Sequence, residues 1–298
     1  MALLPQRAGQ VDLVSPQWFH VQADGRLRAD IDTELLAVAA ELRMPVAPVV
    51  VNEGFRPEVA QALLARERDW KPLADQLAAT AAGYGLRGLH IDFEEVPADA
   101  RASYVRFIAR LSGTLRSRGL LCSIAVGAPL AAAPNEEGCW PDGPHMAALD
   151  YAELGQLVDS MTVMTYDQHT APGFPGPVAG RPWVEACVRR LVEHVPASRL
   201  LLGIPLYYRR WSGQRVVDGP HADAVELAAR VGAQVRLDQR EGEKTYSFVE
   251  RGVSNVVWMQ DRETLRHRTE LARRLGLAGF SAWRLGQEDP ALWAGGFT

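Results

Sequence analysis

The chain has 298 residues, of which 47% are hydrophobic and 23% charged, as in an ordinary globular protein of one large domain or two average ones. Its net charge of −4 at pH 7 provides no basic field for nucleic acid or an anionic membrane surface. The apolar runs fall short of the ~20 residues needed to span a bilayer, and the first residues have neither the charged start nor the apolar core of a signal peptide.

Short apolar runs alternate with helical patterns along nearly the whole chain. Strands are predicted at residues 11–19, 46–52, 88–94, 121–129, 161–167, 200–207 and 279–285. Helices are predicted at residues 30–43, 58–66, 72–84, 98–118, 152–158, 183–194 and 262–275. This alternation, with nearly continuous apolar strands, indicates a parallel sheet covered by helices.

The number of strands and the length favour an α/β fold of the (β/α)8 TIM-barrel type over an open sheet. Seven strands are found where eight are expected, and residues 1–10 offer at most a stub around residues 2–4. The first strand is therefore expected to be missing or rudimentary. Residues 1–298 are expected to form a single domain. Residues 208–260 would be a small α+β insertion in it, with a helix at 222–231 and strands at 245–250 and 254–259.

The three cysteines, Cys122, Cys139 and Cys187, are widely spaced and odd in number. Cys122 lies in an apolar strand pattern and Cys187 in an amphipathic helix pattern, so both are expected to be buried thiols. A disulfide that involves Cys139 is an alternative that the sequence leaves open, but no disulfide framework is implied. No Cys/His pair has the spacing of metal ligands, so neither a metal nor another cofactor is expected.

The predicted strand at residues 88–94 reads Gly-Leu-His-Ile-Asp-Phe-Glu and ends in carboxylates. Successive side chains of a strand point to opposite faces, so His90, Asp92 and Glu94 share one face. Active sites of parallel barrels lie at the carboxyl ends of the strands, which makes Glu94 the natural proton donor. The alternative is a solvated edge strand with an ordinary polar face.

Two further strands end in groups that suit a sugar. The strand at 161–167 closes on Tyr166 and Asp167, and the last strand places Trp283 near its end. An indole stacks on a pyranose face, and the polar groups can hold hydroxyl and amide substituents. A lone Trp also commonly belongs to a core, so it is the combination of carboxylate, phenol and indole that indicates a carbohydrate site.

The motifs at these strand ends resemble those of family 18 glycoside hydrolases, in the branch of bacterial spore-cortex-lytic N-acetylglucosaminidases. The family signature Asp-Gly-x-Asp-x-Asp-x-Glu is matched by Arg-Gly-Leu-His-Ile-Asp-Phe-Glu at residues 87–94. The branch's further motifs are matched by Met-Thr-Tyr-Asp-Gln-His at 164–169, Gly-Ile-Pro-Leu-Tyr at 203–207 and Trp-Arg-Leu-Gly at 283–286. The resemblance covers about residues 11–290.

The resemblance implies a retaining hydrolysis in which the 2-acetamido group of the substrate replaces an enzymic nucleophile. Glu94 would protonate the leaving oxygen and later activate water, and Asp92 would orient the acetamido group. Tyr166 would donate a hydrogen bond to the acetamido oxygen, and Trp283 would form the floor of the sugar subsite.

Four other residues are candidates for substrate binding: Asp167, His90, Tyr207 and Trp18. Asp167 either braces the wall of the site or contacts sugar, and Trp18 either lines a further subsite or packs in the core. His90 departs from the family, which has Asp or Asn there. A cationic His90 would hold Asp92 ionised, whereas a neutral one would make a single hydrogen bond.

The sequence therefore predicts a monomeric β-N-acetylglucosaminidase that acts on a polysaccharide, with peptidoglycan favoured over chitin. A secreted bacterial polysaccharide that contains N-acetylglucosamine is a third substrate class. The alternative from another class is a lectin-like barrel of the same family, and a further alternative is a truncated gene product with two exposed sheet edges. The chemistry favours an extracytoplasmic, cell-wall or spore-associated location, although the chain shows no export signal.

Overall fold

The computed structural model describes residues 3–294, and the chain divides into two compact units. The first unit contains the chain up to Gly127, residues Pro144–Thr162 and residues His194–Arg199. The second contains Ala128–Gly143, Val163–Glu193 and the chain from Leu200 onward. None of the helices in residues 3–294 has the length and apolar character required to cross a membrane.

The first unit alternates strands and helices, as the sequence predicts. Its strands are β1 (Gln17–Val21), β2 (Leu27–Ala29), β3 (Val49–Asn52), β4 (Gly88–Asp92) and β5 (Leu121–Gly127). Its helices are α1 (Thr33–Glu41), α2 (Pro57–Leu64), α3 (Glu67–Gly83), α4 (Arg101–Arg116), α5 (His145–Ala148) and α6 (Tyr151–Leu157), with short 3-10 turns at Pro5–Arg7, Glu53–Phe55, Ala98–Ala100 and Ala197–Arg199. The strand order is β5-β4-β3-β1-β2, and every pair is parallel except β1 with β2.

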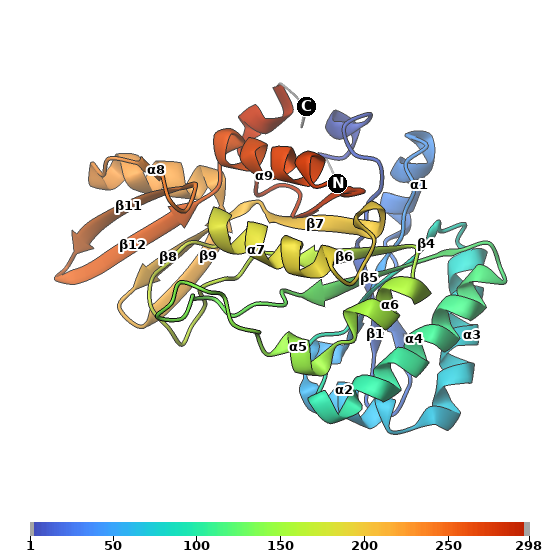
Figure 1. Ribbon diagram of the computed structural model, residues 1–298. Helices are drawn as coiled ribbons and strands as arrows, with labels where there is room; N and C mark the ends of the chain where they lie inside the picture. The colour runs from blue at the N-terminus through green and yellow to red at the C-terminus, as the bar shows by residue number, and fades with distance from the viewer. Residues whose placement is uncertain (1–2, 295–298) are drawn as a thin grey trace. The chain divides into compact units, whose positions relative to one another are not determined.

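The core of the first unit forms where the apolar face of β4 meets its covering helices. Leu89 and Ile91 are completely buried, which confirms the predicted alternation of this strand. Helices α3 and α4 lie side by side (Figure 1). Between them, the ring of Phe107 packs on Trp70 at 5.9 Å and on Phe93 at 5.7 Å between ring centroids. This aromatic packing secures the strand end that carries the carboxylates.

The second unit combines a parallel strand pair with a separate antiparallel sheet. Strands β7 (Leu200–Pro205) and β13 (Gly279–Trp283) pair in parallel, and β6 (Ser160–Met164) begins in the first unit and ends in the second. The other elements are β8 (Tyr207–Ser212), β9 (Arg215–Pro220), β10 (Arg236–Asp238), β11 (Glu243–Glu250), β12 (Val253–Met259), α7 (Arg181–Val192), α8 (His221–Val231), α9 (Arg262–Arg274) and a 3-10 turn at Pro290–Ala294.

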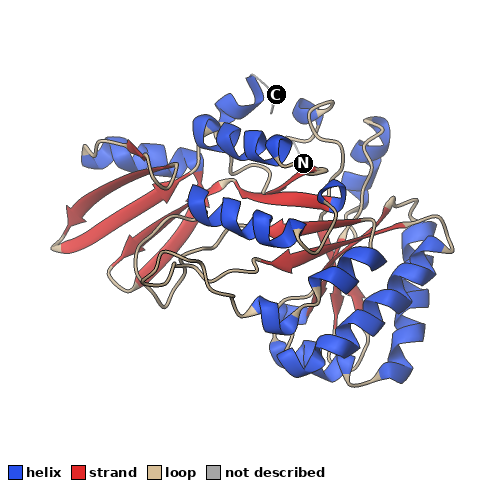
Figure 2. Ribbon diagram, viewed as in Figure 1, coloured by secondary structure: helices blue, strands red, loops and turns tan. Residues whose placement is uncertain are grey.

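The antiparallel sheet occupies the predicted insertion and is larger than expected. Its order is β10-β11-β12-β8-β9, and helix α8 lies along it (Figure 2). Tyr208, Tyr246 and Val257 are buried in a small core between sheet and helix. The prediction of one helix and two strands missed β8, β9 and β10, because Tyr-Tyr-Arg-Arg-Trp-Ser in β8 has no alternation of apolar and polar residues. The expected single domain, residues 1–298 with this insertion in it, stays a prediction.

Several element boundaries differ from the predictions. The first predicted strand, 11–19, is shifted to Gln17–Val21, and Val14 makes only an isolated bridge with Val46. The stub expected at residues 2–4 is a turn over its described residues, while Ala2 lies outside the described part. Strand β4 ends at Asp92, two residues before the expected end.

Helix α3 begins at Glu67, five residues before the predicted start at Pro72, so Pro72 lies inside the helix and does not start it. The cysteine predictions are confirmed, since Cys122 and Cys187 are buried free thiols. Cys139 is also free and is exposed.

Candidate active site

The polar face of β4 carries His90 and Asp92, as predicted. Register places His90 beside Val49 of β3 and Ser123 of β5, and it pairs Asp92 with Val51. Both polar side chains are only partly accessible. The strand therefore delivers an imidazole and a carboxylate, two residues apart, to one end of the first unit's sheet.

His90 is held by a side chain of the neighbouring strand. Its Nδ1 lies 2.8 Å from the Ser123 hydroxyl oxygen, and the Ser123 hydroxyl also lies 3.4 Å from the carbonyl oxygen of Leu89. Burial lowers the pKa of His90 from 6.5 to about 4. The imidazole is therefore neutral at pH 7, and the reading in which a cationic His90 holds Asp92 ionised does not apply there.

Asp92 lies in an environment that favours its protonated form. Burial raises the pKa of its carboxyl from 3.8 to about 6. Its Oδ1 is buried and has no hydrogen-bond partner among the described residues. A buried oxygen of this kind can accept a hydrogen bond from a substrate without first giving up a protein partner.

Glu94 follows β4 and is held through its main chain by Asn52, a residue that the sequence reasoning missed. The side-chain carbonyl of Asn52 accepts a hydrogen bond of 2.9 Å from the Glu94 N–H, and its Nδ2 donates at 3.1 Å to the Glu94 carbonyl. Nδ2 also donates to the carbonyl of Arg56 at 3.1 Å. Asn52 is completely buried, whereas Glu94 is partly exposed. The only signal in the sequence is a polar residue that ends an apolar strand.

Tyr166 belongs to the second unit and packs against β7. A Cβ atom at Gly203 would lie 3.0 Å from Cε1 of Tyr166 and 2.4 Å from the carbonyl oxygen of Val163. The preceding Thr165 is buried, and its hydroxyl donates to the Gly203 carbonyl at 2.7 Å. Glycine at 203 therefore permits the close approach that places the Tyr166 ring.

Asp167 and Tyr207 form one charged cluster in the second unit. Asp167 Oδ1 accepts hydrogen bonds from the Tyr207 hydroxyl at 2.5 Å and from Arg209 Nη2 at 2.7 Å. Arg209 is buried, and its Nε and Nη2 also donate to Asp218 at 2.7 and 3.0 Å. Burial and Asp167 raise the pKa of Tyr207 well above 10, so its hydroxyl stays a donor. Asp167 is thereby held by Tyr207 and by Arg209, an arginine that the sequence reasoning missed. Whether Asp167 braces the wall or contacts sugar stays a prediction.

The two candidate tryptophans differ in accessibility. Trp283 ends β13 with 41% of its surface exposed, and its carbonyl accepts a hydrogen bond of 2.7 Å from Leu206 N–H. Its ring can therefore receive a sugar face. Trp18 in β1 is only 5% exposed, so its ring offers little surface to a ligand, and its role as a subsite residue stays a prediction.

Apart from Trp18 in β1, the predicted site residues fall into two groups, one in each unit. His90, Asp92 and Glu94 lie at the end of β4, and Tyr166, Asp167, Tyr207 and Trp283 belong to the second unit. Within residues 3–294, no group of three or more His, Cys, Asp or Glu side chains could hold a metal ion. The chemistry available is that of carboxylates, phenols and an accessible indole.

The sequence has recognisable relatives. Residues 60–288 match the family described as glycosyl hydrolases family 18. The uncharacterized glycosylase YvbX of Bacillus subtilis (strain 168) is 28% identical over 295 residues, which cover 95% of this chain and 83% of that protein. The cortical fragment-lytic enzyme of the same organism is 26% identical over 285 residues, which cover 92% of this chain and 64% of that enzyme. The chain therefore spans slightly less than two thirds of the length of the lytic enzyme.

Solved structures share the fold. A chitinase from Chromobacterium violaceum ATCC 12472 matches with a TM-score of 0.88 and 27% identity, over 98% of this chain and 92% of that one. The spore cortex-lytic enzyme SleL of Bacillus megaterium QM B1551 matches with a TM-score of 0.85 and 25% identity, over 98% of this chain and 68% of that one. These likenesses confirm the predicted α/β barrel class. Because the family match extends over more than half of the sequence, the chain belongs to family 18 of the glycosyl hydrolases and is a glycosidase.

Proposed function

We propose that this glycosidase hydrolyses β-linked polymers of N-acetylglucosamine by a substrate-assisted, retaining mechanism. The observation that carries the proposal is the end of β4, where Asn52 fixes the main chain of Glu94. Two residues earlier, Asp92 Oδ1 is buried and has no hydrogen-bond partner within residues 3–294. This arrangement supplies a partly exposed carboxyl group for proton transfer and a free acceptor for a substrate amide.

In the proposed reaction, the Glu94 carboxyl donates its proton to the glycosidic oxygen as the bond from that oxygen to the anomeric carbon breaks. The carbonyl oxygen of the substrate's acetamido group attacks the anomeric carbon and forms an oxazolinium ring. Asp92 accepts a hydrogen bond from the acetamido N–H. Water then attacks the anomeric carbon, Glu94 takes the proton from that water, and the ring opens with retained configuration.

Tyr166 and Trp283 complete the proposed set of site residues. Tyr166 would donate its phenolic hydrogen to the acetamido oxygen, and Trp283 would stack on the sugar ring. Support comes from the position of Tyr166 directly before the braced Asp167 and from the exposed indole of Trp283. His90, neutral and bonded to Ser123, would act beneath Asp92 and not on the sugar.

Peptidoglycan and chitin are the proposed substrates, because the relatives include both cortex-lytic enzymes and chitinases. Peptidoglycan is placed first, because the sequence motifs resemble those of the cortex-lytic branch. A cell-wall or otherwise extracytoplasmic place of action follows from that proposal. Monomeric behaviour stays a prediction.

The test compares wild type with Glu94→Gln on N-acetylglucosamine oligomers and on purified peptidoglycan. Wild-type products should have the β configuration when they first form, and the variant should lose at least about a thousandfold in kcat while still binding substrate. Equal product formation by both proteins would contradict the assignment of Glu94. Binding without products from either protein would identify a lectin.

A further inference from the structure

The segment between β6 and α7 has an exposed tip on a buried stem. Residues 170–175, which read Thr-Ala-Pro-Gly-Phe-Pro, are all exposed, and residues 176–180 are all buried. Within the tip, 86% of the surface of Phe174 faces solvent, far more than that of Trp283. A phenyl ring this exposed gains little from folding, because most of its apolar surface remains in water. The ring therefore serves no packing purpose within the second unit.

The beginning of this segment is anchored by the charged cluster of Asp167. Arg209 binds the Asp167 carboxylate and also donates to the carbonyl of His169 at 2.8 Å. Gln168 is buried, donates through Nε2 to the carbonyl of Ala132 at 2.8 Å, and accepts from Gly180 N–H at 2.7 Å. The two ends of the segment are thereby tied to each other as well as to the unit.

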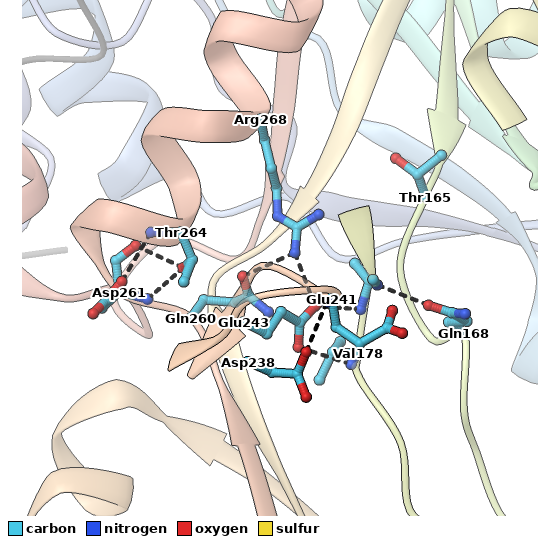
Figure 3. Close-up of polar contacts among 12 residues, drawn as sticks. Thr165, Gln168, Val178, Asp238, Glu241, Glu243, Gln260, Asp261, Thr264 and Arg268 are labelled. Carbon is cyan, nitrogen blue, oxygen red and sulfur yellow. Dashed lines mark hydrogen bonds and ion pairs between the residues drawn. The ribbon is translucent and has the colours of Figure 1, made fainter. Parts of the chain in front are cut away.

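The other end is anchored by a buried ion pair, shown in Figure 3. Glu243 at the start of β11 is completely buried, and its carboxylate accepts hydrogen bonds from Val178 N–H at 3.0 Å and Ala179 N–H at 2.6 Å. Arg268 of α9 donates through Nη2 to the same carboxylate at 2.8 Å and to the side-chain oxygen of Gln260 at 3.1 Å. A buried carboxylate with three donors is held firmly, because each lost partner would leave a buried charge unsatisfied.

Prolines and one tight glycine contact restrain the tip and the start of the stem. Pro172, Pro175 and Pro177 each fix one backbone angle. Gly176 closes tightly on His169, since a Cβ atom at Gly176 would lie 2.5 Å from that imidazole ring. A binding element that is already ordered loses less entropy when a ligand arrives.

We propose that this segment is a rigid arm for the polymer, in which Phe174 stacks on a sugar unit of the chain outside the cleavage subsite and Glu243 with Arg268 holds the arm in place. The proposal rests on the proposed function. The occupant is a glycan, because the same segment begins at Tyr166 and Asp167, the residues proposed to serve the reacting sugar. A flat apolar ring is suited to the face of a pyranose.

The test measures wild type, Phe174→Ala, Phe174→Tyr and Val249→Ala with two substrates, a soluble N-acetylglucosamine trisaccharide and the insoluble polymer that wild type cleaves. Sedimentation with the same polymer measures binding independently of turnover. Val249→Ala is the matched control, because it shortens another apolar side chain that is 73% exposed in the second unit. For the polymer, Phe174→Ala should raise KM and the dissociation constant about threefold to tenfold without a change in kcat.

The trisaccharide kinetics of Phe174→Ala should equal those of wild type, and Phe174→Tyr should restore polymer binding. Equal polymer binding by wild type and Phe174→Ala would overturn the arm while leaving the proposed function intact. Wild type that neither binds nor cleaves any of these glycans would overturn both.

A second variant tests the anchor. Glu243→Gln keeps the shape of the side chain but removes the charge that faces Arg268. Hydrogen exchange at Val178, Ala179 and Gly180 should become faster, and KM for the polymer should rise as in Phe174→Ala, while kcat for the trisaccharide stays within about twofold of wild type. A parallel loss on both substrates would show that the ion pair only stabilises the fold, and unchanged exchange would overturn its role as an anchor.

Discussion

His90 departs from the family pattern, and the effect of this departure depends on the charge of its imidazole. The family has a second acid or an amide at this position, and a histidine there has two different effects depending on its charge. Burial lowers the pKa of His90 to about 4, and the Ser123 hydroxyl provides a partner for Nδ1. At pH 7, His90 therefore replaces the acid or amide of the family with a neutral imidazole, which has one hydrogen-bond donor and one acceptor.

We expect His90→Asn to keep activity and to change the pH profile. Asparagine preserves a neutral polar side chain but removes the titration near pH 4, so the kcat/KM profile should differ from that of wild type below about pH 5, where His90 takes up its proton. The measurement is kcat/KM for an N-acetylglucosamine oligomer between about pH 3.5 and 8, the range in which His90 and Asp92 titrate. A well-folded but inactive variant would show instead that the imidazole itself is required.

At the scale of the elements, parallel pairing brings together residues that are far apart in the sequence. Asn52 ends β3 and Glu94 follows β4, and the two strands are neighbours in the sheet. The same principle acts in the second unit, where β7 supplies Gly203 beneath Tyr166. Residues with proposed roles lie at strand ends, because the ends of neighbouring parallel strands place their side chains at one edge of the sheet.

We expect Asn52→Ala to lower kcat for the proposed reaction about tenfold to a hundredfold, because the Glu94 main chain loses both of its hydrogen bonds to Asn52. Stability should fall by about 1–3 kcal/mol, because buried main-chain groups are left without partners. Oligomer hydrolysis and urea unfolding measure the two effects. Asn52→Asp separates the two contacts, since it keeps the acceptor for Glu94 N–H but replaces the donor with an oxygen that faces the carbonyls of Glu94 and Arg56. Full activity of Asn52→Ala in a folded protein would remove Asn52 from the positioning of Glu94.

At the scale of the whole molecule, the residues with proposed roles are divided between two compact units. The first unit contributes the carboxylates, and the second contributes the phenol, the indole and the braced aspartate. Each unit also contains buried ionisable groups whose pKa values differ from those of the unfolded chain. The free energy of unfolding therefore changes with pH by an amount to which the buried ionisable groups of both units contribute.

His90 and Asp92 should have opposite effects on stability between pH 4 and 6.5. The pKa of His90 falls on folding from 6.5 to about 4, so the unfolded chain binds more protons and stability rises as pH rises through this range. The pKa of Asp92 rises from 3.8 to about 6, so the folded chain binds more protons and stability falls as pH rises. The two contributions partly cancel in the wild type.

Replacing either residue should expose the contribution of the other. From pH 4.5 to 6.5, we expect Asp92→Asn to gain stability more steeply than wild type and His90→Asn to gain less or to lose stability, with differences on the order of 1–3 kcal/mol. Urea unfolding at four pH values in this range measures the slopes. Three parallel curves would mean that neither group changes its pKa on folding.

The sequence alone determined the parts of this protein that depend on local patterns. The period of two in the apolar residues placed β4 and the shared face of His90 and Asp92, and the alternation of strands and helices predicted the α/β class. Polar residues at strand ends, together with the family motifs, singled out Glu94, Tyr166 and Trp283. Segments without such a period, above all β8, β9 and β10, were missed.

Only the tertiary structure decided the contacts between distant residues and the charge states that follow from burial. Asn52 reaches Glu94 across 42 positions in the sequence, and Arg209 reaches Asp167 across 42 as well. The neutral state of His90 depends on its burial beside Ser123. No local pattern encodes these features, because hydrogen-bond partners and desolvation are set by whichever strands become neighbours in the folded sheet.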